Sequence, residues 1–519
     1  MAEELSDNAI ARCKSEPGRW VYILLAFVLA AGAFLIIPAE SLDSTGEVVA
    51  GLSYTGRAVV AIAVLMATLW VTAALPMAVT ALMPLILFPL CTGGSISIKA
   101  AAAPYAHEMV FLFMGGFMIS VAMQQWGLHR RLALHAVLLI GTGPRRLIGG
   151  LMVSSALISM WVSNTATVVM MLPIAVSVVE LVRGELSRIE SADLPSAGQP
   201  FNFAICLMLG IAYSASIGGI GTLIGTPPNA LMAAFLKDNY QIDISFAQWA
   251  VIALPLVLVF VPTVWLLLTS VIFPVRIRSV GGGRGLIRKG LEDQGPLSRG
   301  ELTVLIVFAV TAAAWMTRPL LGRLTLPGGL RPLAGLSDPG IAIAAAVALI
   351  CLPVDLKRGV SALSWQQASK IPWGILILFG GGLSLAAALR SSGVTEFIGR
   401  SVSGLGDLPN WVMILLASSV PALASELTSN TASIAILLPM FAAVAEGCGI
   451  DPLLMIIPAT IAASFAFMMP VATPPNALVF ASGEITISQM CKAGIWLNIL
   501  GIALVMLHMY LVVLPVLGI

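Results

Sequence analysis

Residues 425–432 read Ser-Glu-Leu-Thr-Ser-Asn-Thr-Ala, and residues 159–166 read Ser-Met-Trp-Val-Ser-Asn-Thr-Ala. Each stretch lies at the centre of an apolar run, 409–445 or 146–181, that is long enough for two short helices. Polar side chains at membrane depth cost free energy unless they face a site or a cavity. We therefore predict that each run is a re-entrant hairpin with its tip near the middle of a membrane.

A second shared string, Thr-Pro-Pro-Asn-Ala-Leu, follows each of these runs, at residues 226–231 and 473–478. Proline lacks a backbone donor and clashes with the preceding helical turn. The apolar segments 202–237 and 452–482, which contain these strings, are therefore predicted to be discontinuous helices. Two hairpins and two broken helices in matched order favour a binding site between two related halves.

The two halves align along much of their length. Phe-Met-Gly-Gly at residues 113–116 precedes Phe-Gly-Gly-Gly at residues 379–382 by 266 residues, and the Ser-Asn-Thr-Ala copies have the same offset. The glycine runs predict close helix packing. The Thr-Pro-Pro copies are 247 residues apart, because the first half carries a charged segment at 180–200. Co-linear matches over this distance indicate an internal repeat.

Composition identifies the class of protein. Of the 519 residues, 59% are hydrophobic and 10% are charged, whereas a soluble domain carries about 25% charged residues. The net charge of +2 gives no reason to expect a nucleic-acid partner. The six cysteines and four histidines have no metal-ligand or disulfide spacing. We expect an all-α polytopic membrane protein whose main partner is the lipid bilayer.

The predicted organisation has four parts. They are an N-terminal segment with the first transmembrane helix (1–56), repeat 1 (57–275), a cytoplasmic linker (276–300) and repeat 2 (301–519). Nine runs are long and apolar enough to span without interruption. These are 20–37, 57–75, 77–92, 109–126, 247–273, 301–317, 340–353, 372–389 and 490–517.

Basic residues in the short loops predict the orientation. They gather before the first span, on both sides of the first hairpin and in the linker, which places the N-terminus in the cytoplasm. Glu446 and Asp451 follow the second hairpin, which suits the outer face, although Arg390 and Arg400 before it point the other way. The two repeats are therefore expected to have inverted topology in an inner (plasma) membrane.

The polar residues at the hairpin tips and helix breaks, called hinges below, suggest which ions they bind. Backbone carbonyl and hydroxyl oxygens at a hinge suit a hard cation such as sodium, and free N–H groups at a helix start attract anions. The amide groups of Asn164 and Asn430 can serve both. Other interpretations stay open: Ser-Asn-Thr as a helix N-cap, Thr-Pro-Pro-Asn as an ordinary turn, and Glu426 as either a hinge-bonding or an ion-binding residue.

The paired motifs resemble those of the divalent anion/sodium symporter family, the INDY-like carriers, over nearly the whole chain. This resemblance implies about 11 transmembrane helices, two re-entrant hairpins, a homodimer and an elevator motion. It implies a first sodium site of Ser159, Ser163, Asn164 and Gly225. It implies a second sodium site of Ser425, Thr428, Asn430 and Ala472. The residues implied for the substrate are Asn164, Thr165, Ser429, Asn430, Thr431, Thr473 and Pro474.

We therefore expect a sodium-coupled symporter that imports C4-dicarboxylates such as succinate, malate and fumarate. Sodium would be co-transported at two or more sites, and no organic cofactor is expected. Sulfate, citrate or another divalent oxyanion, or dicarboxylate exchange, are the alternatives within this fold. A cation/proton antiporter needs acids within the membrane, of which the hairpin centres hold only Glu426. An enzyme is not expected, because no H-E-x-x-H or G-x-S-x-G motif is present.

Overall fold

The computed structural model describes residues 18–518, apart from residues 43–47, 142, 189–200, 278–282, 324–330, 332, 334, 403 and 405–407. Within this part most residues are helical. The described strands form two short antiparallel hairpins, one of β1 (Ser41–Leu42) with β2 (Val48–Ala50) and one of β3 (Pro353–Asp355) with β4 (Val360–Ser361).

The first half contains the predicted hairpin and the predicted broken helix. Its helices are α2 (Gly18–Ile36), α3 (Tyr54–Thr72), α4 (Met77–Ala81), α5 (Pro84–Cys91), α6 (Ile98–Ala102), α7 (Glu108–Gln125), α8 (Leu128–Ile140), α9 (Pro144–Ser159), α10 (Asn164–Arg188), α11 (Asn202–Ile220), α12 (Pro227–Tyr240) and α13 (Phe246–Leu266). The hairpin consists of α9 and α10, and the broken helix consists of α11 and α12.

The second half repeats this order after α14 (Gly283–Glu292), which lies in the predicted linker. Its helices are α15 (Arg299–Leu321), α16 (Asp338–Cys351), α17 (Trp365–Ala368), α18 (Trp373–Ser391), α19 (Val394–Val402), α20 (Asn410–Leu427), α21 (Asn430–Gly447), α22 (Leu453–Ala462), α23 (Pro474–Ala481), α24 (Ile487–His508) and α25 (Leu514–Leu517). Here α20 and α21 form the hairpin, and α22 and α23 form the broken helix.

Eleven helices in the described residues are long and apolar enough to cross a membrane. Seven of them coincide with spans expected from the sequence, and the other four are the hairpin arms α10, α20 and α21 and the first part of the broken helix, α11. The run 77–92 is divided into α4 and α5, since Pro84 begins a new helix. Helix α16 has only 14 residues, which is short for a span of about 20.

Helix α11 lies at the centre of the molecule. All its residues from Phe203 to Ile220 are buried, and it packs against α9, α10 and α13 of its own half and α23 of the other half. A helix that is apolar on every side is expected in such a position. The first broken helix is therefore surrounded by both hairpin arms and by its counterpart in the second half.

The glycine runs pack closely against other helices, as predicted, and these contacts join the two halves. A Cβ at Gly115 of α7 would lie 2.6 Å from the backbone of Ala342 in α16, and a Cβ at Gly381 of α18 would collide with the backbone of Ala81 in α4. Glycine at these positions lets helix backbones approach closely. Each run packs against a helix of the opposite half, so the two halves are joined through matched contacts.

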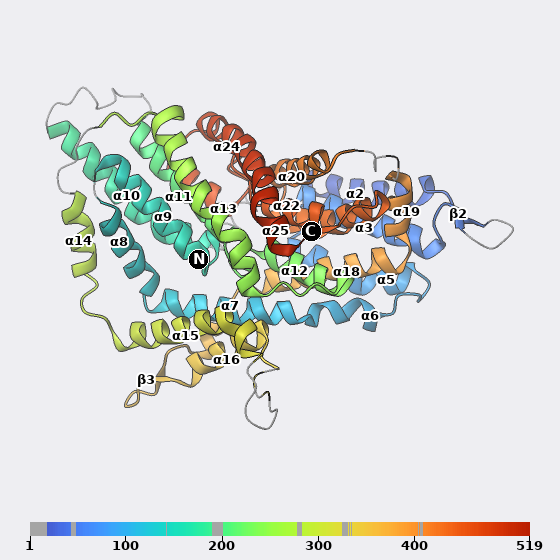
Figure 1. Cartoon of the computed structure of the whole chain (residues 1–519), viewed down its shortest axis with the longest axis horizontal. Helices are drawn as coiled ribbons and strands as arrows, with labels where there is room; N and C mark the ends of the chain where they lie inside the picture. Colours follow the sequence, from blue (N-terminus) through green and yellow to red (C-terminus); the bar gives the residue numbers. More distant parts are fainter. Residues whose placement is uncertain are drawn as a thin grey trace.

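Figure 1 shows the molecule with its longest axis horizontal. Helices α8, α9, α10 and α14 lie toward one end, whereas α5, α6, α19 and β2 lie toward the other. Helices α12 and α22, which belong to the two broken helices, lie between these ends. The described structure thus places the breaks well inside the helical body, and α12 packs directly against α21 and α22.

Candidate functional site

The tip of the first hairpin is a four-residue turn between α9 and α10. Ser159, the last residue of α9, is fully buried, and its hydroxyl lies 2.5 Å from Oδ1 of Asn164. Ser163 caps α10, because its hydroxyl accepts a hydrogen bond from the backbone N–H of Ala166 at 3.3 Å. The N-cap interpretation therefore holds for Ser163, while Ser159 and Asn164 bring two oxygen atoms together beside it.

The break in the first broken helix faces this tip through Gly219. A Cβ at Gly219 would lie 2.6 Å from Oδ1 of Asn164 and 3.1 Å from the carbonyl oxygen of Gly225. The absence of a side chain at Gly219 therefore leaves room for both oxygens. Two of the four residues predicted for the first sodium site, Asn164 and Gly225, have oxygens beside this glycine, and the hydroxyl of a third, Ser159, contacts the Asn164 oxygen.

The second hairpin presents two buried oxygens that have no hydrogen-bond partner among the described residues: the hydroxyl of Ser425 and Oδ1 of Asn430. Ser425 is fully buried. A buried polar atom without a partner costs about 1–3 kcal/mol. Oxygen atoms without donors suit a hard cation, so these two members of the predicted second sodium site are chemically fitted to bind one.

Thr428, the third predicted side chain of that site, is engaged elsewhere. Its hydroxyl donates to the carbonyl of Ala424 at 3.0 Å and shares a hydrogen bond with the hydroxyl of Ser433. The hydroxyl therefore links the end of α20 to the first turn of α21. Ser429 differs from Ser163, because its side chain makes no capping hydrogen bond to α21. The two hairpin tips are similar in sequence, but different side-chain hydrogen bonds stabilise their turns.

Glu426 connects the second hairpin to the second broken helix through hydrogen bonds. Its carboxylate accepts hydrogen bonds from the backbone N–H groups of Phe467, Met468 and Met469 at 2.8–3.1 Å. The amide of Asn498 in α24 donates to it at 2.8 Å. The side chain is almost completely buried. Of the two roles left open by the sequence, the structure shows the hinge-bonding one.

The residues predicted to bind the substrate lie at helix starts. Asn164 and Thr165 begin α10, Asn430 and Thr431 begin α21, and Pro474 begins α23 with Thr473 as its N-cap. Helix α10 packs against α23, and α12 packs against α21, so each hairpin contacts the broken helix of the opposite half. Helix N-termini carry a partial positive charge that favours anions.

An apolar cavity of about 360 Å³ lies beside the first tip, between α9, α13 and α15. Its polar group, the hydroxyl of Thr222, already donates to the carbonyl of Met160. The aromatic rings of Trp161 and Phe246, which are stacked 5.8 Å apart, are also part of its lining. Such a lining does not fit a dianion, so this cavity is not the candidate anion site.

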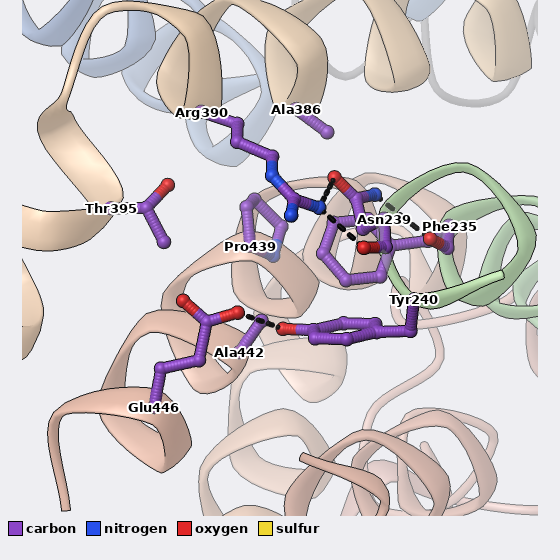
Figure 2. Close-up of a pocket in the computed structure, with 9 residues that line it drawn as sticks. All are labelled: Phe235, Asn239, Tyr240, Ala386, Arg390, Thr395, Pro439, Ala442 and Glu446. Atoms are coloured by element: carbon purple, nitrogen blue, oxygen red, sulfur yellow. Dashed lines mark hydrogen bonds between the residues drawn. The ribbon is translucent and has the colours of Figure 1, made fainter.

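A polar cluster lies where α12, α18 and α21 meet (Figure 2). Arg390 donates to the backbone and side-chain oxygens of Asn239 at 2.7 and 2.9 Å, and Tyr240 donates to Glu446 at 2.6 Å. The space enclosed is about 10 Å³, enough for one water molecule. The cluster links the end of the first broken helix to the second hairpin and to α18.

Three asparagines at the breaks and beside Glu426 were not singled out from the sequence. Asn229 and Asn476, the asparagines of the two Thr-Pro-Pro-Asn strings, are fully buried and donate through Nδ2 to backbone carbonyls at the breaks. Asn498 was missed as a partner of Glu426. The repeated string contained the first two residues, but only the folded chain shows which carbonyls they reach.

These features define a polytopic membrane transporter in which two hairpins and two broken helices meet. The chain belongs to the sodium:sulfate symporter family, because the family model described as "Sodium:sulfate symporter transmembrane region" matches residues 20–517. This agrees with the resemblance inferred from the paired motifs. The family and the relatives named below are transporters, in agreement with the expectation that the chain is not an enzyme.

Among curated proteins, the chain is 37% identical over 471 residues to the sodium-dependent dicarboxylate transporter SdcS of Staphylococcus saprophyticus. It is 35% identical over 473 residues to SdcS of Staphylococcus aureus strain USA300. Each alignment covers 90% of this chain and 88% of the relative.

Among solved structures, the YdaH transporter of Alcanivorax borkumensis has a TM-score of 0.57 at 15% identity, covering 95% of this chain and 98% of that one. MtrF of Neisseria gonorrhoeae has a TM-score of 0.56 at 12% identity, covering 97% of each. At these identities the similarity concerns the fold alone.

Proposed function

We propose that this protein is a sodium-coupled symporter that imports C4-dicarboxylates such as succinate, malate and fumarate. The observation that carries the proposal is the pair of unpartnered buried oxygens, the Ser425 hydroxyl and Asn430 Oδ1, in the second hairpin. The names of the two Staphylococcus relatives, sodium-dependent dicarboxylate transporters, favour the same ion and the same class of substrate.

The proposed sodium sites use oxygen atoms only. The first comprises Ser159, Ser163, Asn164 and Gly225, and the second comprises Ser425, Thr428, Asn430 and Ala472. Sodium prefers such oxygen ligands, and the described residues hold no group of three or more His, Cys, Asp or Glu side chains that would suit a transition metal. Because the Thr428 hydroxyl is hydrogen-bonded within the hairpin, we assign its contribution to the backbone carbonyl.

The first sodium site can be tested at Gly219. In Gly219→Ala the new methyl group would displace Asn164 Oδ1 or the Gly225 carbonyl, so we expect the sodium concentration for half-maximal uptake to rise about tenfold. Gly116→Ala is the matched control, because the Cβ it adds would lie 3.4 Å from its nearest neighbour, an ordinary contact. Unchanged sodium dependence of uptake in Gly219→Ala would remove this glycine from the site.

We propose that the dianion binds between the hairpin tips, at Asn164, Thr165, Ser429, Asn430, Thr431, Thr473 and Pro474. Helix starts supply N–H groups, the side chains supply amide and hydroxyl donors, and the bound sodium ions supply positive charge. Binding of sodium first would order the hinges for the anion. Hydrogen bonds distributed over many groups suit a carrier that must also release its substrate.

The cluster around Arg390 offers a contrasting prediction. Its guanidinium is exposed, is bonded to Asn239 and lies 5.9 Å from the centre of the Tyr240 ring. We expect Arg390→Ala to leave the succinate KM within about twofold of wild type, because exposed polar pairs contribute little. The KM is measured from initial rates in proteoliposomes. A KM raised tenfold or more would move the anion site toward this cluster.

The mechanism we propose is an elevator motion in a homodimer, with the N-terminus in the cytoplasm and two inverted repeats in the plasma membrane. Helices α8 and α14, which include basic residues predicted to be cytoplasmic, lie toward the same end of the molecule (Figure 1) and pack against each other. This grouping supports the proposed orientation. The four-part organisation predicted from the sequence is retained as part of this proposal.

Transport of labelled succinate into proteoliposomes tests the function. With an inward sodium gradient we expect accumulation, and with choline in place of sodium we expect none. Uptake that proceeds equally in choline would overturn sodium coupling.

The substrate class needs a separate experiment, because sulfate, citrate or another divalent oxyanion, or exchange of dicarboxylates, would use the same hinges. Thermal unfolding of the purified protein is measured with each anion, with and without sodium. We expect succinate with sodium to raise the unfolding temperature most, because a ligand at 100 times its Kd stabilises by about 2.7 kcal/mol. A larger rise with sulfate or citrate would reassign the substrate.

A further inference from the structure

We propose that Asn229 and Asn476 are a matched pair of positioning residues that set the cation preference of the two proposed sodium sites. The inference rests on the proposed function and adds a residue to each half. Neither asparagine is assigned to bind the ion. Each is inferred to hold the backbone carbonyl that does, Gly225 in the first half and Ala472 in the second.

The amide of Asn229 binds the backbone at the first break. Its Nδ2 lies 3.2 Å from the carbonyl oxygen of Gly219, 3.2 Å from that of Ile220 and 2.7 Å from that of Thr222. These carbonyls lie where α11 ends, so they lack the partners that a continuing helix would supply. The two N–H bonds of this amide are thus shared among carbonyls that the break leaves open, and the Ile220 carbonyl also accepts from the indole N–H of Trp249.

The amide of Asn476 repeats this arrangement in the second half. Its Nδ2 lies 2.9 Å from the carbonyl oxygen of Ala466 and 3.1 Å from that of Met469. These acceptors lie ten and seven residues before Asn476, the same separations that join Asn229 to Gly219 and Thr222. Two independent breaks therefore use one and the same bond pattern.

The pattern extends from each asparagine to the proposed sodium ligand. The Thr222 carbonyl that accepts from Asn229 also accepts from the N–H of Gly225 at 3.4 Å. The Met469 carbonyl that accepts from Asn476 also accepts from the N–H of Ala472 at 3.2 Å. In both halves a shared carbonyl connects the amide to the residue whose own carbonyl is proposed to bind sodium.

The first half provides a second connection through Gly219. Its carbonyl accepts from Asn229, while a Cβ on this residue would lie 2.6 Å from Asn164 Oδ1 and 3.1 Å from the Gly225 carbonyl oxygen. Movement of the Gly219 peptide would therefore change the distance between two proposed sodium ligands. Ligand spacing decides which cation fits a site best, and second-shell partners set that spacing.

The oxygen atoms of both side-chain amides indicate that these asparagines have a role beyond bonding the carbonyls at the helix ends. Oδ1 of Asn229 and Oδ1 of Asn476 are buried and have no hydrogen-bond partner among the described residues. Such an atom costs about 1–3 kcal/mol, and both halves retain it. A requirement for the Nδ2 donors at these two places explains why the cost is tolerated twice.

The test measures thermal unfolding of the purified full-length protein while sodium chloride, or lithium chloride, replaces choline chloride. For Asn229→Ala and Asn476→Ala we expect the sodium concentration that gives half of the stabilisation to rise about tenfold or more. We also expect the ratio of the lithium to the sodium midpoint to change. A loss of folded protein alone would not alter this ratio, which separates positioning from a merely structural role.

Asn202→Ala is the matched control, because Asn202 donates an equivalent amide hydrogen bond to the Pro274 carbonyl at 3.1 Å, at the start of α11 and away from the break. Asn202→Ala should keep the wild-type sodium concentration for half of the stabilisation and the wild-type ratio of the lithium to the sodium midpoint. If the alanine variants do not fold, the near-isosteric Asn229→Asp and Asn476→Asp replace them. Unchanged midpoints and ratios in the folded variants would overturn the inference.

The inference would also be overturned if neither the alanine nor the aspartate variant folds at either position. The amides would then be needed for folding itself. A wild-type protein without any sodium-dependent stabilisation would instead count against the proposed function. The two failures are therefore distinguishable in one set of measurements.

Discussion

Asn164→Ala and Asn430→Ala are each expected to lower sodium-dependent succinate uptake by about 100-fold or more. Each substitution removes an amide that is proposed to bind sodium through its oxygen and the dianion through its NH2 group. In the first hairpin the change also removes the partner of the Ser159 hydroxyl. In the second it removes one of the two buried oxygens that have no hydrogen-bond partner among the described residues, Asn430 Oδ1, and keeps the other, the Ser425 hydroxyl. Initial rates in proteoliposomes, normalised to folded protein, measure the effect.

The control for this experiment is Asn410→Ala, at the exposed start of α20. It makes the same chemical change within the second hairpin but far along the helix from the tip, and we expect wild-type uptake. Sodium-dependent uptake at wild-type rates in either tip variant would show that the Ser-Asn-Thr hinges are structural only.

Glu426→Ala is expected to destabilise the folded protein, because each buried donor left without a partner costs about 1–3 kcal/mol. The carboxylate accepts three backbone N–H groups at the second break and the Asn498 amide. Removing it leaves these donors without a partner in a buried place. We expect a lower unfolding temperature and loss of the stabilisation by sodium, since Met469 N–H and the Met469 carbonyl belong to the same stretch of backbone that leads to Ala472.

Glu446→Ala provides the comparison, because Glu446 is also an acid of the second hairpin but lies near the end of α21 and accepts from Tyr240. It should retain the sodium-dependent rise in unfolding temperature. A Glu426→Ala variant as stable as Glu446→Ala, with the sodium effect intact, would contradict the anchoring role given to the carboxylate.

Much of the fold could be predicted because polar and proline residues stand out in apolar sequence. The Ser-Asn-Thr-Ala copies identified the turns before α10 and α21, and the Thr-Pro-Pro-Asn copies identified the starts of α12 and α23. The division of 77–92 at Pro84 was missed, since the run is mainly apolar and contains two prolines, of which Pro84 begins a new helix while Pro89 lies inside it. Whether the hairpins are re-entrant and the repeats inverted stays a prediction.

The site was less accessible to sequence reasoning. That Ser159 meets Asn164 follows from their spacing across a tight turn, but the approach of Gly219 to both Asn164 and Gly225 depends on how α11 packs against the hairpin. The Glu426 bonds to residues 467–469 likewise join segments that are more than forty residues apart. Such contacts are set by tertiary packing, which local patterns do not encode.

Counting both solutes in the same proteoliposomes tests the central claim most directly. Radioactive sodium and labelled succinate are supplied together outside the vesicles, and the initial uptake of each is measured for the wild-type protein and for Asn430→Ala. Two cation sites around one anion predict that two or more sodium ions enter with each succinate, and that both fluxes fall together in the variant. Succinate entry without accompanying sodium would contradict the account.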